Sequence, residues 1–294
     1  MKILYAASEA VPFCKTGGLA DVAGSLPAAL AAQGADVAVV LPLYQKVKEK
    51  FSDQLHFECY DYVDLAWRHS YCGLFSMERD GVTWYFLDNE QYFRRPELYG
   101  YMDDGERFGF FSRAVVRMLP HLRFWPEVIH CNDWQTALVP VYMLEERYHV
   151  PELANTKTVF TIHNIEYQGR YGDQVLEDVI GLDRSYLNEG MLGYYKDVNL
   201  MKGAIMASNF VTTVSPTYAE ELRTPFYGRG LDGVINQQSE KIVGILNGID
   251  MELRHGEVYG LVGETGAGKT ALVSAVKLLV GERADSSYVR EGAK

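Results

Sequence analysis

Apolar residues in this chain gather in short runs that alternate with longer segments of helical periodicity. The first run, residues 2–7, is continuously apolar after its first residue, which is typical of a strand buried on both faces of a parallel sheet. The Ala-rich segment 22–33 predicts a helix that stops at Gly34, and residues 35–41 predict a second strand. Strand, helix and strand in this order predict a βαβ unit with a right-handed crossover.

The same alternation continues to residue 246. Residues 55–87 alternate aromatic and polar positions and predict two or three half-buried strands joined through Asp80-Gly81. Asp103-Asp104 is expected to cap the next helix, and segment 167–195 predicts only short helices. The other predicted strands are 128–131, 157–162, 210–214 and 241–246, and the other predicted helices are 105–119, 134–148, 199–207 and one that starts at Pro216. The chain therefore predicts an α/β fold with a Rossmann-like parallel sheet flanked by helices.

Polar residues follow five of the predicted strands, namely Ser8-Glu9, Asn132-Asp133, His163-Asn164, Ser215 and Asn247. The carboxyl ends of parallel strands lie along one edge of a sheet, and ligands bind in the crevice at that edge. We therefore expect Lys15, Asp133, His163 and Asn247 to lie near one another. Any single one of these residues could instead be a helix cap or a turn former, and Asp133 is equally suited to cap the helix after it.

A glycine turn, Lys-Thr-Gly-Gly-Leu-Ala-Asp-Val at residues 15–22, separates the first strand from the first helix. Gly17 and Gly18 allow a ligand to approach the backbone closely, and Lys15 adds a positive charge beside the helix N-terminus. Asp21 can cap the helix or accept hydrogen bonds from hydroxyl groups. Such a turn suits a phosphate-bearing, polyhydroxylated ligand such as a nucleotide sugar. The alternative is an ordinary βα turn with a solvated lysine.

Composition narrows the class of protein. The chain has 294 residues, of which 48% are hydrophobic and 23% charged, as in a globular protein of one large or two medium domains. A formal net charge of −11 argues against a nucleic-acid partner or an anionic membrane surface. No apolar run reaches the roughly 18 residues of a membrane span. The four cysteines, Cys14, Cys59, Cys72 and Cys131, lack metal-ligand spacing, so we expect no metal and a reducing, cytoplasmic location.

Five motifs together resemble one family. The turn at 15–22 is similar to the donor-binding loop of bacterial glycogen synthases and plant starch synthases, and the further matches, in the family's order, lie at 130–134, 161–164, 214–219 and 246–250. The resemblance covers residues 1–250 and implies the N-terminal, Rossmann-like domain of a two-domain GT-B glycosyltransferase. It implies retaining transfer of glucose from ADP-glucose to the non-reducing end of an α-1,4-glucan (glycogen or starch), without a metal or other cofactor.

The resemblance also implies a role for each site residue. Lys15 and the amides of Gly17 and Gly18 would face the phosphates of ADP-glucose. His163 would hydrogen-bond a sugar hydroxyl, with its carbonyl near the anomeric carbon, so Lys15 and His163 are the candidate catalytic residues. The alternative for His163 is a strand-end histidine satisfied by backbone. The remaining candidate substrate-binding residues are Asp21, Asp133, Asn164 and Asn247. Aromatic residues between 92 and 101 would stack on sugars or anchor their loop.

Residues 251–294 do not resemble that family. Residues 263–270 match the P-loop pattern G-x-x-x-x-G-K-[ST] between an apolar run and a predicted helix, so the segment predicts a strand, a P-loop and a helix. Gly263, Gly266 and Gly268 would let the backbone cradle phosphates, Lys269 would reach the β- and γ-phosphates, and Thr270 would hold Mg²⁺. We expect this chain to bind ATP and Mg²⁺ only if the P-loop is functional. The continuation of the segment is similar to the start of RecN-type ATPases.

The 44 residues after Asp250 are too few for a second Rossmann-like domain, which in the GT-B family supplies half of the active site. We therefore expect two fragments joined near residue 250, a domain at 1–250 and a P-loop fragment at 251–294. Three functions compete: a glucan synthase or its N-terminal half, a P-loop ATP-binding protein of the DNA-repair or transporter class, and a non-catalytic glucan-binding remnant. The extent of the first resemblance favours the first.

Overall fold

A computed structural model describes residues 1–122, 124–188 and 190–247. Its strands form two sheets. The strands of the large sheet are β1 (Lys2–Ala6), β2 (Asp36–Pro42), β3 (His56–Leu65), β4 (Arg68–Arg79), β5 (Val82–Asp88), β6 (Val128–Asn132), β7 (Lys157–Ile162), β11 (Phe210–Thr213) and β12 (Ile242–Gly244). The strands of the small sheet are β8 (Arg170–Gly172), β9 (Gly193–Tyr194) and β10 (Asp197–Asn199).

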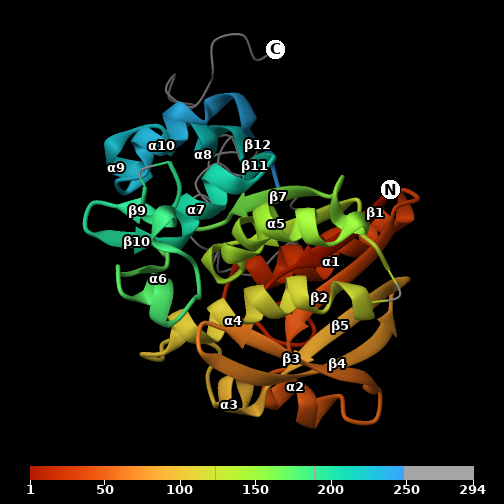
Figure 1. Cartoon of the computed structure of the whole chain (residues 1–294). Helices are drawn as coiled ribbons and strands as arrows, with labels where there is room; N and C mark the ends of the chain where they lie inside the picture. The colour runs from red at the N-terminus through yellow and green to blue at the C-terminus, as the bar shows by residue number, and fades with distance from the viewer. Residues whose placement is uncertain (123, 189, 248–294) are drawn as a thin grey trace, which may run out of the picture.

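The large sheet has the order β12-β11-β7-β6-β1-β2-β5-β4-β3 (Figure 1). All pairs from β12 to β5 are parallel, and the β3–β4–β5 meander at the other end is antiparallel. The small sheet, β8-β10-β9, is antiparallel. The prediction of an α/β fold with a mostly parallel sheet is confirmed.

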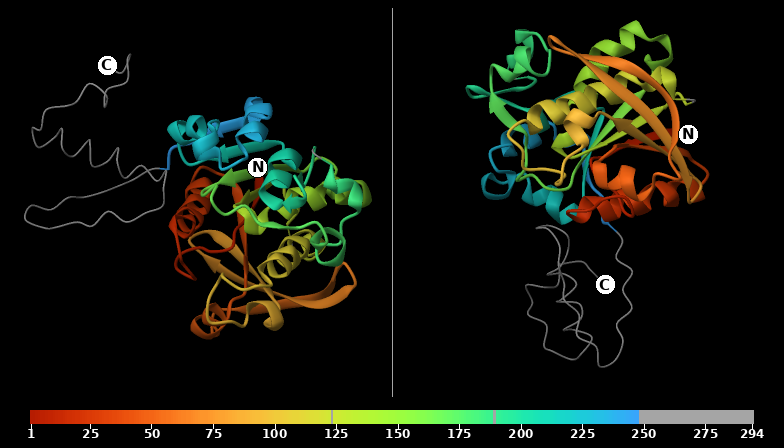
Figure 2. Two further views of the ribbon diagram at one scale, coloured as in Figure 1. Left: turned by 90° about the vertical axis from the view of Figure 1, so that its left-hand side faces the viewer. Right: turned by 90° about the horizontal axis from the view of Figure 1, so that it is seen from below.

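Helices cover both faces of the large sheet. The α-helices are α1 (Gly18–Ala32), α2 (Gln45–Lys50), α3 (Glu90–Phe93), α4 (Asp104–Arg117), α5 (Leu138–His149), α6 (Val175–Asp178), α7 (Leu200–Ala207), α8 (Pro216–Glu221), α9 (Pro225–Gly228) and α10 (Asp232–Gln237). Helix α5 packs between α4 and α7. Helix α1 lies on the opposite side of the sheet from α4 and α5 (Figure 2, right), as right-handed crossovers in opposite directions from β1 require.

The strand order reverses between β1 and β6. From β1 the chain moves through α1 to β2 on one side, and it later returns to β6 on the other side and continues outward to β7, β11 and β12. A reversal of this kind leaves a crevice at the carboxyl ends of the two central strands, which is where open α/β sheets bind ligands. The fold therefore places the ends of β1 and β6 at the expected position of a site.

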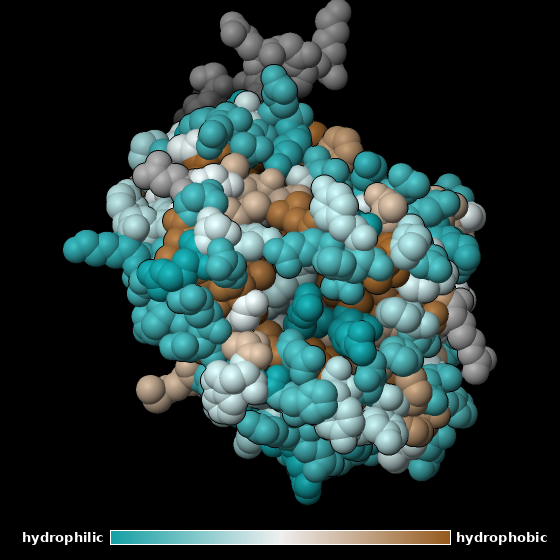
Figure 3. Space-filling view, viewed as in Figure 1, coloured by the Kyte–Doolittle hydropathy of each residue, from teal (hydrophilic) through white to brown (hydrophobic). Residues whose placement is uncertain are grey.

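The core explains the continuous apolar runs. Leu4, Tyr5 and Ala6 of β1 have no exposed surface, because helices cover both faces of this central strand. Tyr92 and Phe93 are also buried, so these two rings anchor their loop and do not offer a sugar-stacking surface. On the face drawn in Figure 3, apolar residues form patches interrupted by polar ones. Across the described residues, no helix is long and apolar enough to cross a bilayer.

The expected helix caps were wrong. Helix α1 begins at Gly18, so Asp21 lies inside its first turn, and the capping position belongs to Gly17. Asp103 precedes α4 without making a capping hydrogen bond. Both predicted aspartates there are held by arginines instead, Asp103 by Arg95 and Asp104 by Arg107. A charged guanidinium is a stronger partner for the Asp103 carboxylate than a backbone amide. Asp104 also accepts the N–H groups of Gly100 (2.8 Å) and Tyr101 (3.2 Å) in the preceding loop.

Two further segments differ from the prediction, and the predicted turn at Asp80-Gly81 is confirmed. The expected helix 134–148 is divided into a 3₁₀ turn, Trp134–Thr136, and α5. Segment 167–195 contains the short helix α6, a 3₁₀ turn and two short strands of the small sheet. The meander has three strands, and Asp80 and Gly81 both have positive φ (55° and 74°), as the predicted two-residue turn requires. The predicted P-loop lies outside the described residues.

Candidate active site

The predicted site residues lie along the carboxyl edge of the parallel strands. Asp133 follows β6, His163 and Asn164 follow β7, and Asn247 lies beyond β12, where its N–H donates to the carbonyl of Val214 (3.2 Å). These strands are neighbours in the sheet together with β11 and β1. The expected grouping of Asp133 with His163 and Asn164 is therefore present, whereas Asn247 lies at the outermost strand of the same edge.

Asp133 joins the ends of two neighbouring strands. Its Oδ1 accepts hydrogen bonds from the N–H groups of His163 (2.8 Å) and Asn164 (3.3 Å). Its backbone has φ 55° and ψ −180°, a conformation that is nearly confined to glycine and costs about 1–3 kcal/mol. It makes no capping bond to the following turn, so the capping interpretation was wrong. Strain at a buried aspartate on a crevice edge is common at functional sites.

His163 is buried, and its ring is oriented by Asn132. The Asn132 side-chain amide donates to the carbonyl of Ala6 (3.0 Å), so its Oδ1 is the atom that faces Tyr5 and His163. His163 Nε2 lies 3.0 Å from that oxygen and therefore donates its hydrogen to it. The ring thus bonds a side chain rather than backbone. Burial lowers the pKa of His163 to about 3, with a smaller contribution from His130, so the imidazole is neutral at pH 7.

Glu9 holds the glycine turn in place. Its buried carboxylate accepts hydrogen bonds from the N–H and the hydroxyl of Thr16 and from the N–H of Gly17 (3.2 Å). In this structure the Gly17 amide is therefore directed at a carboxylate of the protein, and exposed Gly18 is the first residue of α1. Sequence reasoning placed Glu9 at a strand end but gave it no role. The contact between Glu9 and the turn depends on the folded structure, so the sequence alone does not reveal it.

Lys15 lies on the solvent side of the same turn. Its Nζ is 2.7 Å from both carboxylate oxygens of Asp21, and the two side chains are 50% and 56% exposed. Ion pairs this exposed contribute about 0–1 kcal/mol to stability, so phosphate oxygens could replace the Asp21 carboxylate at little cost. In this structure Asp21 therefore pairs with the ammonium group of Lys15.

A cavity of about 540 Å³ opens between the ends of β1 and β6. Its lining contains two of the predicted site residues, Asp133 and Asn164, and Tyr99, one of the aromatic residues expected to stack on sugars or to anchor their loop. It also contains residues that the sequence did not assign to the site, namely Glu9, Thr16, Leu19, Gly100, Asp104, Trp134, Gln135 and Tyr167. The Tyr99 hydroxyl lies 2.7 Å from Ser8 Oγ, which fixes this ring at the mouth of the crevice. Carboxylates, amides and aromatic rings around one cavity are the groups that bind hydroxyl-rich ligands.

The described residues contain no group of three or more His, Cys, Asp or Glu side chains that could hold a metal ion. The expectation that no metal is needed stays a prediction. The five P-loop residues from Gly263 to Thr270 lie outside the described residues, so the structure places none of them.

Comparison with known proteins identifies the class. The family model of the starch synthase catalytic domain matches residues 2–237, and the chain belongs to this family. Over 256 residues it is 46% identical to the glycogen synthase of Clostridium novyi (strain NT), covering 87% of this chain and 53% of that protein. Over 257 residues it is 47% identical to the glycogen synthase of Geobacillus thermodenitrificans (strain NG80-2), with the same two coverages. The chain therefore spans about half the length of these curated relatives.

A solved structure has the same fold. The catalytic domain of starch synthase IV from Arabidopsis thaliana, bound to ADP and acarbose, is similar with a TM-score of 0.78 and 35% sequence identity. The similarity covers 84% of this chain and 52% of that one. Together with the family match, this confirms the predicted resemblance and the GT-B half-fold. A family model of ABC transporters matches residues 246–290, and the P-loop and the similarity to RecN-type ATPases stay predictions.

Proposed function

We propose that residues 1–250 form the N-terminal half of an ADP-glucose-dependent α-1,4-glucan synthase, which transfers glucose with retention to the non-reducing end of glycogen or starch. The observation that carries this proposal is the cavity at the strand reversal between β1 and β6. Its polar lining suits a sugar, and the matching starch synthase binds ADP and the oligosaccharide acarbose. Residues 251–294 are proposed as a separate P-loop fragment.

In this proposal catalysis is mainly electrostatic positioning. Negative charge grows on the departing diphosphate, and Lys15 would stabilise it after exchanging the Asp21 carboxylate for phosphate oxygens. The Gly18 amide at the start of α1 adds the positive end of a helix dipole, and the Gly17 amide would reach the phosphates only after leaving the Glu9 carboxylate. Asp21, released from Lys15, becomes an acceptor for ligand hydroxyls. No metal or other cofactor is proposed for this transfer.

His163 and its neighbours would hold the glucosyl unit. A neutral imidazole positions a hydroxyl without adding a charge that would oppose the positive character developing at the anomeric carbon. Asp133 fixes the backbone of His163, which we propose lies with its carbonyl beside that carbon. Asn164 lines the cavity and would contact sugar hydroxyls, and Asn247 would approach the substrate from the far end of the same edge.

The test has two parts. The purified chain is titrated with ADP-glucose and with acarbose, and transfer of radiolabelled glucose from ADP-glucose to glycogen is measured. Binding of both ligands supports the proposed half-site, and transfer shows that the chain is itself active. Glucan binding without ADP-glucose binding would indicate a non-catalytic glucan-binding remnant. Binding of neither ligand contradicts the proposal.

The match at 246–290 favours a second candidate function, nucleotide binding by the P-loop fragment. Gly263, Gly266, Gly268, Lys269 and Thr270 are the proposed phosphate- and Mg²⁺-binding residues. We expect the fragment not to form a competent P-loop. Tight ATP binding that Lys269→Ala abolishes and Lys15→Ala leaves intact would contradict that expectation.

A further inference from the structure

The His163 ring makes a hydrogen bond through one of its two nitrogens. Its Nε2 lies 3.0 Å from Asn132 Oδ1, whereas its Nδ1 makes no hydrogen bond to any residue that the structure describes. An imidazole nitrogen donates when it carries a hydrogen and accepts when it does not. The bond made by Nε2 therefore decides what the ring can do at Nδ1, the nitrogen that remains for a ligand.

Two backbone carbonyls fix the orientation of the Asn132 amide. Its nitrogen donates to the carbonyls of Ala6 (3.0 Å) and His130 (3.4 Å), which can only accept. Its oxygen therefore points the other way, where it accepts from the Tyr5 hydroxyl (2.9 Å) and from His163 Nε2. These two bonds use both lone pairs of the oxygen. Asn132 and Tyr5 have no exposed surface, so bulk water does not compete for these bonds.

This arrangement selects one neutral tautomer of His163. A hydrogen on Nδ1 would leave two acceptors, Nε2 and Asn132 Oδ1, facing each other at 3.0 Å. The hydrogen therefore lies on Nε2, and Nδ1 carries a lone pair. Burial lowers the pKa of the ring to about 3, so protonation does not add a second N–H near neutral pH. At Nδ1 the ring can accept a hydrogen bond and cannot donate one.

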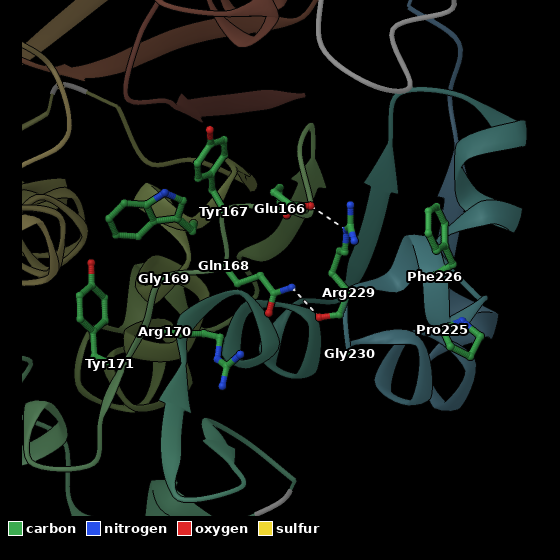
Figure 4. Close-up of a pocket in the computed structure, with 11 residues that line it drawn as sticks. Glu166, Tyr167, Gln168, Gly169, Arg170, Tyr171, Pro225, Phe226, Arg229 and Gly230 are labelled. Atoms are coloured by element: carbon green, nitrogen blue, oxygen red, sulfur yellow. Dashed lines mark hydrogen bonds and ion pairs between the residues drawn. The ribbon is translucent and has the colours of Figure 1, made fainter.

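Other groups hold the backbone around His163. Asp133 Oδ1 accepts the backbone N–H of His163 (2.8 Å). Further along the same segment, the buried Gln168 side-chain amide donates to the carbonyl of Arg229 (3.1 Å; Figure 4). Neither contact uses Asn132. Replacing the Asn132 amide therefore removes a constraint on the imidazole and leaves these backbone anchors in place.

We propose that Asn132 and Tyr5 are positioning residues that set the tautomer of His163, so that Nδ1 accepts a hydrogen bond from a hydroxyl group of the glucosyl unit. The inference rests on the proposed function, which places His163 beside that unit. A hydroxyl that donates to Nδ1 gains negative character on its oxygen. This favours the positive charge that develops at the anomeric carbon.

The tautomer is tested first, without a ligand. Nitrogen NMR of the isotope-labelled full chain at pH 7 distinguishes a protonated from an unprotonated ring nitrogen, and His163→Gln assigns the signals. Wild type is expected to show His163 protonated at Nε2 only. Asn132→Leu, which is similar in size and lacks the acceptor, should shift both signals toward an average of the two tautomers, and Tyr5→Phe should shift them less. Thr212→Val removes the hydroxyl 2.6 Å from Thr161 Oγ1 and serves as the control.

The role in binding is tested by calorimetric titration with ADP-glucose and with ADP, which lacks the glucosyl unit. Asn132→Leu is expected to weaken ADP-glucose binding about tenfold, the effect of one lost hydrogen bond, and to leave ADP binding unchanged. Thr212→Val is expected to change neither affinity. A purely structural role of Asn132 would weaken the binding of both ligands.

A wild-type His163 protonated at Nδ1, or the same spectrum in Asn132→Leu and wild type, would overturn the inference and leave the proposed function standing. So would equal weakening of ADP-glucose and ADP binding by Asn132→Leu, or no weakening of either. Failure of wild type to bind ADP-glucose would contradict the proposed function, and with it this inference, whichever tautomer is found.

Discussion

Asp133 Oδ1 accepts the backbone N–H of His163 at 2.8 Å, and this bond ties the end of β6 to the end of β7 at the strand reversal. The same oxygen accepts the N–H of Asn164, so one carboxylate orders two residues of the candidate site. The interaction connects a strained backbone position with the residue proposed to hold the transferred sugar.

Removing this carboxylate should affect both stability and binding. Asp133→Ala keeps the strained backbone and leaves two N–H groups without their acceptor, so we expect a loss of about 1–3 kcal/mol in the free energy of unfolding. Asp133→Asn retains an oxygen acceptor and should lose less than half as much. Urea denaturation measures the free energy of unfolding of both variants. Calorimetric titration with acarbose should show weaker binding by Asp133→Ala than by wild type. Equal stability of Asp133→Ala and wild type would contradict the proposed role of the carboxylate.

Stability should fall as pH is lowered below the ordinary pKa of histidine. Burial lowers the pKa of His163 to about 3 and that of His130 to about 4, against an ordinary value of 6.5. Between about pH 4 and 6.5 the unfolded chain therefore binds more protons than the folded chain, and each histidine reduces stability by about 1.4 kcal/mol per pH unit in that range.

Urea midpoints at pH 7.5, 6 and 5 test this. The stability of His130→Gln, and likewise that of His163→Gln, should fall less on acidification than that of wild type. Each variant lacks one histidine that takes up a proton on unfolding. Variants with the same pH dependence as wild type would show that neither imidazole is held neutral in the fold.

Gly169 tests the packing around Trp134, a ring that lines the cavity at Asp133. It has φ +63°, and a Cβ there would lie 2.8 Å from the Trp134 ring and 3.2 Å from Leu200. Gly169→Ala should therefore combine backbone strain with a displaced Trp134, costing about 1–3 kcal/mol and shifting tryptophan fluorescence. Gly34→Ala is the matched control, because Gly34 has φ +89° with no neighbour within 4 Å of the added Cβ. A fluorescence shift of the same size in both variants would argue against a contact with Trp134.

The sequence predicted the parallel part of the sheet well, because buried parallel strands leave long apolar runs. β7 spans Lys157–Ile162, with both ends at the predicted residues. The small sheet was missed because its strands have two or three residues, too few for any periodicity, and because β8 pairs with β10, which lies far along the chain. The helix caps were wrong because Arg95 pairs with Asp103 and Arg107 pairs with Asp104, and cap preferences by residue type take no account of such pairs.

The site could be predicted only in part. Residues that follow strands, such as Asp133 and Asn164, are identifiable because sheet topology alone brings strand ends together. Tyr99 was predicted only as one of several loop aromatics, because its loop is positioned by Arg107, a fully buried residue that donates to the carbonyls of Tyr92 (2.8 Å) and Leu98 (3.1 Å). A buried arginine that organises a loop has no distinguishing sequence pattern.

The central claim is that ADP-glucose binds at the glycine turn between β1 and α1. The most direct measurement is calorimetric titration of wild type, Lys15→Ala and Lys269→Ala with ADP-glucose, ADP and ATP, with Lys46→Ala as a surface-lysine control. Because the Lys15–Asp21 pair is exposed, Lys15→Ala should keep its stability within about 0.5 kcal/mol, so a loss of binding reports on the ligand.

The account predicts that wild type, Lys269→Ala and Lys46→Ala bind ADP-glucose and ADP, and that Lys15→Ala loses at least tenfold, or about 1.4 kcal/mol, in affinity. Unchanged binding by Lys15→Ala, with loss in Lys269→Ala, would place the nucleotide at the P-loop fragment and contradict the account.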